Sequence, residues 1–216
     1  MMTKAITLLL ALAGFLPLAQ AQDAQAGQAK ASMCMGCHGI PRYQASFPQV
    51  YKVPKISGQG AQYIVAALTE YRKGERHHPT MQAIAGSLSD KDMADLAAYF
   101  STDVPASMRK VVAETPPAAP AEVAALIARG ACTSCHGVNF DKPIAPTYPK
   151  LAGQHADYLF AALRAYASPD HALFGRNNAI MGAQVKQFKE SELKAIATYI
   201  GSLPGDIHTV PESRFR

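Results

Sequence analysis

The feature that most constrains this chain is a six-residue cysteine pattern that occurs twice, at residues 34–39 and 132–137, and uses all four cysteines. The spacing C-x-x-C-H is the attachment signal for c-type haem, because two thiols on one turn of backbone reach the two vinyl groups of the macrocycle. The histidine that follows places an imidazole beneath the iron. We therefore predict two covalently bound haem c groups, with these tethering and ligating residues: Cys34, Cys37, His38, Cys132, Cys135 and His136.

Two other kinds of site also use C-x-x-C pairs, namely a redox disulfide and one half of a zinc site. Both interpretations leave the histidine after the second cysteine unexplained, and here it occurs in both copies. A thioredoxin-like site would also need strands on either side of the motif, whereas the flanking segments have the composition of helices. The duplicated pattern therefore favours haem.

The first 21 residues have the composition of a secretory signal peptide. Lys4 supplies a positive charge, residues 6–18 form a short apolar core, and residues 19–21 read Ala-Gln-Ala, a typical cleavage site. The apolar core is interrupted by Gly14 and Pro17 and is shorter than the ~20 residues that span a bilayer. We expect export to an oxidising compartment, no transmembrane segment after the signal is removed, and thioether bonds rather than disulfides at the cysteines.

The formal net charge of +5 does not predict a nucleic-acid partner. Two haems bring four propionates, which offset most of this charge in the mature protein. A high isoelectric point calculated from the amino acids alone is therefore weak evidence for a polyanionic partner.

The chain is a tandem repeat. The cysteine motifs lie 98 positions apart, the Pro-Lys segments at Pro54 and Pro149 lie 95 apart, and Met81 and Met181 lie 100 apart. The order of these landmarks is the same in both halves, so small insertions explain the drift. We predict a signal peptide at 1–21, one domain at 22–112, a proline-rich linker at 113–120 and a second domain at 121–216. The tail after Leu203 has no periodicity and is expected to lie on the surface or to fray.

Each unit is predicted to be helical. A first helix is expected at residues 23–33 and 121–131, and a middle helix begins after Gln59 and runs to about Lys73, with its counterpart beginning after Gln154. The last helix of the first unit opens with a Ser-x-x-Asp capping box at Ser89. Its buried positions and those of its counterpart are Met93, Leu96, Ala97, Phe100, Leu193, Ile196, Ala197 and Ile200. No strand pattern of convincing length occurs, so the predicted class is all-α.

The repeat also indicates the sixth ligand of each haem. The second unit contains one methionine, Met181, and its partner in the first unit is Met81. His77 and His78 are the rival ligands in the first unit, but asparagines stand at the corresponding positions of the second. His-Met ligation raises the reduction potential and closes both axial positions, which are the properties of an electron carrier.

Several other residues have two possible roles. The carbonyls of Pro54 and Pro149 could accept a hydrogen bond from the proximal histidine, or these prolines could simply form turns, which the spacing alone favours. Four basic residues could pair with haem propionates, although solvated surface charge is the default for them: Arg72, Lys73, Arg76 and Arg164. Exposure is the default for the histidines that have no counterpart in the first unit, His155, His171 and His208.

On these residues each unit resembles a class I cytochrome c domain, and the tandem pair resembles the dihaem cytochrome c4 family of bacterial periplasms. The resemblance is carried by the two cysteine motifs, residues 54–59 and 148–154, the two methionines and the last-helix aromatic residues. It implies two tandem domains that each wrap one covalent haem, related by a pseudo-twofold axis with their propionates facing each other. It further implies His-Met ligation by His38, Met81, His136 and Met181, with Pro54 and Pro149 as the histidine-orienting carbonyls.

The resemblance also implies a function. We expect a non-enzymatic one-electron carrier in the periplasm, which receives electrons from a quinol-oxidising complex or another donor and delivers them to a terminal oxidase. The alternatives are a dihaem redox enzyme of the thiosulfate dehydrogenase or peroxidase type, and a bound subunit of a respiratory complex. Residues 168–180 lengthen the approach to Met181, so the second haem site is the less closely matched of the two.

Overall fold

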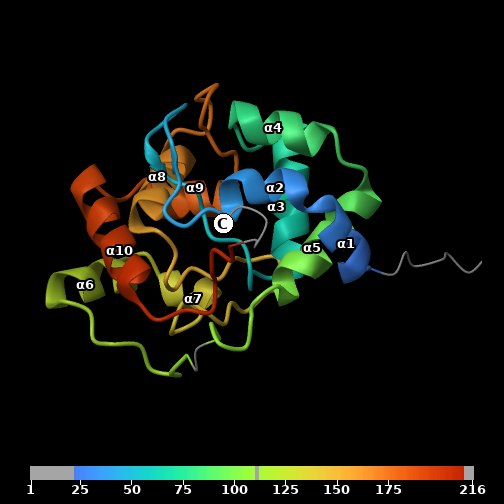
Figure 1. The fold of residues 1–216 in the computed structure, drawn as a ribbon. Coiled ribbons are helices and arrows are strands. Elements are labelled where there is room, and N and C mark those ends of the chain that lie inside the picture. The colour runs from blue at the N-terminus through green and yellow to red at the C-terminus, as the bar shows by residue number, and fades with distance from the viewer. Residues whose placement is uncertain (1–21, 110–111, 212–216) are drawn as a thin grey trace, which may run out of the picture.

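The computed structural model describes residues 22–109 and 112–211 (Figure 1), so the predicted signal peptide lies outside the described residues. Helices dominate both halves, and the predicted all-α class is confirmed. The first half contains α1 (Ala24–Lys30), α2 (Ser32–His38), α3 (Ala61–Lys73), α4 (Pro79–Gly86) and α5 (Asp90–Thr102). The second half contains α6 (Ala121–Arg129), α7 (Cys132–His136), α8 (Ala156–Ala167), α9 (Ala179–Val185) and α10 (Glu190–Ser202). The helix order of the first half therefore recurs in the second, while the predicted domain boundaries stay predictions.

The buried faces of the last helices form the centres of the two cores. All four residues predicted for α5 and all four predicted for α10 are at most 5 % exposed. In the first half this face packs against Ala31 and Ile64, and in the second half it packs against Leu159 and Phe140. The capping box at Ser89 is also confirmed, because its hydroxyl accepts from Asp92 N while the Asp92 carboxylate accepts from Ser89 N.

The predicted first helix of the first unit is interrupted at Ala31. Asp23 caps α1 by accepting from the backbone of Gln25 and Ala26, and α2 begins directly after Ala31. Ala31 keeps helical dihedral angles (φ −68°, ψ −13°), so the interruption is a bend between two helices that sequence periodicity does not reveal. In the second unit Ala131 has a φ of +45° and separates α6 from α7.

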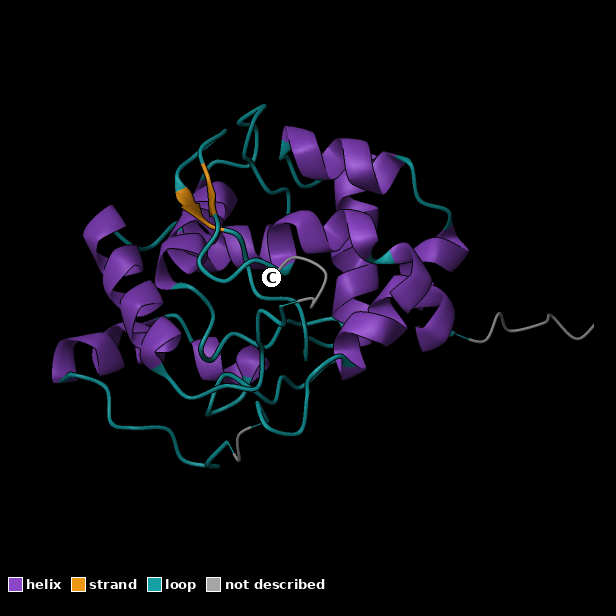
Figure 2. Cartoon of the chain, in the orientation of Figure 1, coloured by secondary structure: helices purple, strands orange, loops and turns teal. Residues whose placement is uncertain are grey.

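One short hairpin departs from the expectation that the chain has no strands (Figure 2). The strands β1 (Gln44–Ala45) and β2 (Tyr51–Lys52) pair antiparallel in the loop between His38 and Pro54. Two-residue strands are too short to produce an alternating pattern, which is why the sequence did not predict them. The hairpin contacts the second half of the chain, since both Lys52 N and Lys52 Nζ donate to Asp157, at 3.1 and 2.9 Å.

The C-terminal segment was predicted to lie on the surface or to fray, and this prediction is wrong for its described part. Ile207 is 1 % exposed, and the backbones of Ser57 and His208 exchange two hydrogen bonds of 2.8 and 3.3 Å. Asp206 N also donates to Asp141 at 3.2 Å. The segment is therefore held by pairing with residues distant in sequence, which leaves no periodic signature. The His208 side chain is correspondingly only 12 % exposed, contrary to expectation.

A buried carboxylate ties α1 to α5. Asp95 accepts from Lys30 Nζ at 2.8 Å, from Lys91 Nζ at 3.0 Å and from Asp23 N at 3.1 Å, while its own side chain is fully covered. Hydrogen bonds from Lys30 and then Lys91 lower the pKa of Asp95 to about 2. Because the folded-state pKa lies below the ordinary value, this carboxylate stabilises the fold above about pH 4, and the contribution is lost as the pH falls toward 2.

Asp95→Asn is therefore expected to lower the melting temperature at pH 6. It should also reduce the further fall in melting temperature between pH 4 and pH 2. The reason is that the amide keeps the bond from Asp23 N but cannot pair with either lysine. Thermal melts followed by circular dichroism at a series of pH values would measure both effects. Asp90→Asn is the matched control, because Asp90 is an exposed carboxylate at the start of the same helix. Parallel pH curves for the wild type and Asp95→Asn would contradict the assignment.

Candidate haem sites

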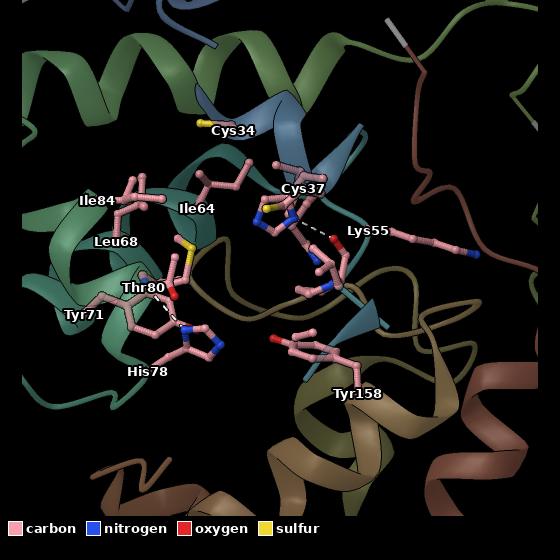
Figure 3. Close-up of a pocket in the computed structure, with 18 of the residues that line it drawn as sticks. Cys34, Cys37, Lys55, Ile64, Leu68, Tyr71, His78, Thr80, Ile84 and Tyr158 are labelled. Carbon is pink, nitrogen blue, oxygen red and sulfur yellow. Dashed lines mark hydrogen bonds between the residues drawn. The ribbon is translucent and has the colours of Figure 1, made fainter. Parts of the chain in front are cut away.

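A cavity of about 400 Å³, lined mainly by the first half of the chain and partly by the second, brings the predicted site residues of the first unit together. Its lining includes both predicted tethers, Cys34 and Cys37, and both predicted axial residues, His38 and Met81. In Figure 3 the two cysteines lie on one side of the cavity on α2, while His78 lies on the opposite side. Most of the remaining wall is apolar, with contributions from Ile64, Leu68, Ile84, Leu88, Leu96 and Phe100.

The ring of each proximal histidine is oriented by a backbone carbonyl. His38 Nδ1 lies 2.8 Å from Pro54 O, and His136 Nδ1 lies 3.3 Å from Pro149 O. A carbonyl only accepts, so Nδ1 carries the proton and Nε2 carries the lone pair. Burial lowers the pKa of both histidines, which favours this neutral form. Each ring can thus offer Nε2 to a metal, although ligation itself stays a prediction.

The two methionines occupy equivalent places at the starts of α4 and α9. Met81 N donates to the Nδ1 atom of His78 at 3.3 Å, and Met181 N donates to Asn178 Oδ1 at 3.0 Å. His78 and Asn178 are therefore N-caps that hold the first turn of each short helix. This shared capping role accounts for His78 without making it an iron ligand, even though it lines the same cavity as Met81.

The segments that lead to the two methionines pair with each other across the middle of the molecule. His77 N donates to Gly175 O at 2.8 Å, and Asn177 N donates to Glu75 O at 2.7 Å. The longer segment of the second unit folds back through a hydrogen bond of 2.8 Å from Gly175 N to His171 O. Its extra residues thus form an exposed turn, in which His171 stacks on Phe174. His171 is exposed, as predicted.

This pairing places two arginines side by side in the interior. Arg76 and Arg176 are 4 % and 9 % exposed, so the expectation of a solvated charge is wrong for Arg76. Both guanidinium groups donate to the hydroxyl of Tyr158, at 2.7 and 3.2 Å, and Arg76 also donates to Tyr63 at 3.3 Å. The guanidinium of Arg76 additionally lies 4.6 Å from the centre of the Tyr71 ring.

Sequence reasoning raised pairing with haem propionates for Arg76 but preferred a solvated charge, and it gave Arg176 no such role, although a signal was available. The two arginines are 100 positions apart, which is the spacing of the two methionines. Burial is decided by the contact between the two halves, which a charge count does not show. His155 was likewise expected to be exposed but is half-buried, and burial and Lys55 lower its pKa to about 4.

The arginine pair fits a cofactor that carries carboxylates. Burying two like charges is costly unless anions compensate them. Among the residues that the structure describes, neither arginine forms an ion pair, and Arg76 Nε is buried without a hydrogen-bond partner. Haem brings two propionates; Arg76 lines the cavity that contains the cysteines, and Arg176 binds the hydroxyl of Tyr158, which also lines it.

The cysteines fit thioether attachment better than a zinc site. All four thiols are free and partly buried, and burial raises the pKa of Cys34 to about 11 and also raises that of Cys132. Across residues 22–109 and 112–211 no cluster of three or more His, Cys, Asp or Glu side chains could hold a metal ion, so a zinc site lacks ligands.

Comparison with known proteins decides the family. The Cytochrome c family model matches residues 24–102 and again residues 120–204. Cytochrome c4 of Pseudomonas aeruginosa is 34 % identical over 210 residues, covering 94 % of this chain and all of the relative. The chain belongs to the dihaem cytochrome c4 family. Family membership establishes two covalently attached haem c groups, and the cysteines, the neutral histidines and the buried arginines described above fit them.

This chain is also similar to a solved structure and to a second curated relative. The crystal structure of reduced recombinant cytochrome c4 from Pseudomonas stutzeri has a TM-score of 0.64 and 27 % identity, covering 85 % of this chain and all of that chain. A protein named thiosulfate dehydrogenase electron acceptor, from Stutzerimonas stutzeri, is 32 % identical over 86 % of this chain and 88 % of its own length. Two tandem cytochrome c domains in an all-α fold, as predicted, are therefore confirmed. No helix within the described ranges is long and apolar enough to cross a bilayer.

Proposed function

We propose that this dihaem electron carrier works in the periplasm, where it receives single electrons from a quinol-oxidising complex or another donor and passes them to a terminal oxidase. The observation that carries the proposal is the cavity in which Cys34, Cys37, His38 and Met81 meet. When bound, haem iron supplies one-electron chemistry by alternating between its ferric and ferrous states.

The proposed axial ligands are His38 with Met81 in the first domain and His136 with Met181 in the second. Each histidine is fixed by a proline carbonyl, and each methionine is fixed by an N-cap on its own helix. A neutral imidazole and a thioether would together supply both protein ligands of the iron and would favour its reduced state. A site of this kind has no open position for a substrate, which supports a carrier rather than an enzyme.

The proposed role of Arg76 and Arg176 is to compensate the propionates where the two domains meet. Both guanidinium groups are bound to Tyr158, which also lines the first cavity, so the arginines are held in place before any anion arrives. Because they are buried, their attraction for a carboxylate is screened little by water and salt.

Redox partners are proposed to dock where apolar side chains reach the surface beside each site. Tyr43 and Phe47 line the first cavity and are 43 % and 57 % exposed. In the second domain Val138 and Ile144 lie close in sequence to His136 and are 66 % and 70 % exposed. Small apolar contact surfaces suit the short-lived complexes that electron carriers form.

The absorption spectrum of the oxidised protein tests the proposal. Two haems with methionine bound to ferric iron are expected, so the weak far-red band of that ligation should have the intensity of two such sites per chain. Rapid mixing of the reduced protein with a terminal oxidase should then oxidise both haems. A high-spin haem or a bis-histidine haem in the wild type would favour the enzyme alternative.

The relative from Stutzerimonas stutzeri supports a second candidate donor, a thiosulfate dehydrogenase. Thiosulfate alone should leave the oxidised protein unchanged, because the proposed ligands leave no open axial position. Thiosulfate together with its dehydrogenase should reduce both haems if that enzyme is the donor. Reduction by thiosulfate alone would instead show that this chain is itself the enzyme.

A further inference from the structure

The two domains hold each other through a reciprocal pair of glutamine side chains. Gln154 Oε1 accepts from Lys55 N at 3.0 Å, and Gln154 Nε2 donates to Lys55 O at 3.0 Å. Gln59 makes the same two bonds with the backbone of Lys150, each at 2.9 Å. Both glutamines are 4 % exposed, so these bonds form away from water.

Each glutamine binds the peptide group that orients the proximal histidine of the opposite domain. The carbonyl of Pro54 and the N–H of Lys55 belong to one peptide group, and its oxygen lies 2.8 Å from His38 Nδ1. Gln154 therefore acts on His38 through a single planar amide. In the other direction, Gln59 reaches His136 through the peptide group between Pro149 and Lys150.

The orientation of each glutamine is itself fixed. The same Oε1 atom that accepts across the interface also accepts from the next backbone N–H of its own chain segment, Gly60 N at 2.9 Å for Gln59 and His155 N at 3.0 Å for Gln154. A further hydrogen bond between the two halves lies next to Gln154, because Lys55 Nζ donates to Gly153 O at 2.7 Å. A carboxamide held by three hydrogen bonds presents its oxygen to the partner peptide in one orientation only.

Hydrogen bonds in series strengthen one another. When an acceptor binds the N–H of a peptide, electron density moves toward the carbonyl oxygen of that peptide, which becomes a better acceptor. A stronger hydrogen bond from Nδ1–H to the carbonyl oxygen makes the imidazole a stronger electron-pair donor to iron through Nε2. A more electron-rich axial ligand stabilises the ferric state, so the reduction potential falls.

We propose that Gln154 is a positioning residue for the first haem site and Gln59 for the second, so that each domain sets the proximal ligand of the other. The inference deepens the proposed function and rests on its assignment of His38 and His136 as axial ligands. It gives a reason why both glutamines bind these two peptides. The effect should be larger at the first site, because its bond from Nδ1 to the carbonyl is 2.8 Å against 3.3 Å at the second.

The test compares Gln154→Ala with Gln59→Ala in the haem-loaded protein. Gln154→Ala should raise the reduction potential of the first haem, with about a threefold change in its equilibrium constant, since cooperative strengthening is modest, ~10–30 % per bond. The second haem should change less, and Gln59→Ala should show the reverse pattern. Nuclear magnetic resonance of the two Nδ1 protons in the reduced state supplies an independent readout, in which the affected proton exchanges faster with solvent.

Two further variants distinguish a specific effect on the proximal histidine from a general loosening of the interface between the domains. Gln154→Glu keeps an oxygen that accepts from Lys55 N, so the Nδ1 proton of His38 should exchange as slowly as in the wild type. Asp157→Asn removes the cross-domain ion pair with Lys52 without touching either peptide, and should leave both Nδ1 protons unchanged.

The outcomes are distinct. Equal effects on both haems, or an effect confined to the domain that carries the substitution, would overturn the inference. If Gln154→Ala does not fold, the exchange rates of the Nδ1 protons in Gln154→Glu and Gln59→Ala still decide whether a glutamine acts on the histidine of the opposite domain or on that of its own domain. Failure of the proposed function would appear earlier, as a wild-type spectrum without methionine-ligated haem.

Discussion

Met81→Ala is expected to remove roughly half of the far-red absorption band of the oxidised protein and to lower the potential of one haem, because a thioether ligand favours ferrous iron. Met181→Ala should remove the other half, and the double variant should lack the band. The two methionines occupy equivalent capped positions on α4 and α9, so the two single variants should behave alike. Absorption spectra and a potentiometric titration of each variant measure the effect.

Two controls identify the cause of the change. Met93→Leu alters a fully buried methionine of α5 that contacts Thr69 of α3 and is not among the residues that line the cavity, so it should leave the band intact. His78→Asn places in the first domain the N-cap that the second domain already uses, so the band should persist. An unchanged band in Met81→Ala would rule out Met81 as the ligand, and a wild-type band of one-site intensity that is unaffected by Met81→Ala would point to His78 instead.

Gly27→Ala is expected to destabilise the protein by about 1–3 kcal/mol, the usual cost of forcing an extra methyl group into a packed contact. Gly27 is the buried residue of α1 where that helix crosses α5. A methyl group there would collide with the backbone carbonyl of Asp95 and would lie 2.8 Å from Tyr99 Cβ. Backbone atoms of a helix cannot move aside, so α1 would have to lift away from α5.

The matched control is Gly86→Ala, the same substitution at the last residue of α4. A methyl group at Gly86 meets nothing within 4 Å, so the higher helix propensity of alanine should stabilise the protein by up to about 1 kcal/mol. Guanidinium unfolding followed by circular dichroism compares the two variants. Equal midpoints for Gly27→Ala and Gly86→Ala would show that the crossing of α1 and α5 is less tight than the structure indicates.

The residues of the first site were largely predictable because they lie in short motifs. Cys34, Cys37 and His38 are set by one turn of chain, and Met81 was found by its counterpart in the second unit. The structure brings all four to one cavity. The hairpin at residues 44–52 and the bend at Ala31 were not predictable, since each is shorter than the window that a periodic pattern needs.

The interface between the domains was not predictable for a different reason. Arg76, Gln59 and their counterparts carry no sequence signal of burial, because a polar residue is normally solvated unless a partner covers it. The bonds from Arg76 to Tyr158 and from Gln154 to Lys55 join residues 82 and 99 positions apart along the chain. Only the folded arrangement decides which polar groups meet.

The sequence by itself determined that there are two haems, two similar helical units and one candidate methionine for each, since covalent attachment and duplication are written in local spacing. The tertiary structure alone decided how the units communicate. It buried two arginines at a shared tyrosine, and it placed each glutamine behind the histidine-orienting peptide of the other domain. Hydrogen bonds between distant segments depend on the relative position of both domains, and no local pattern encodes that position.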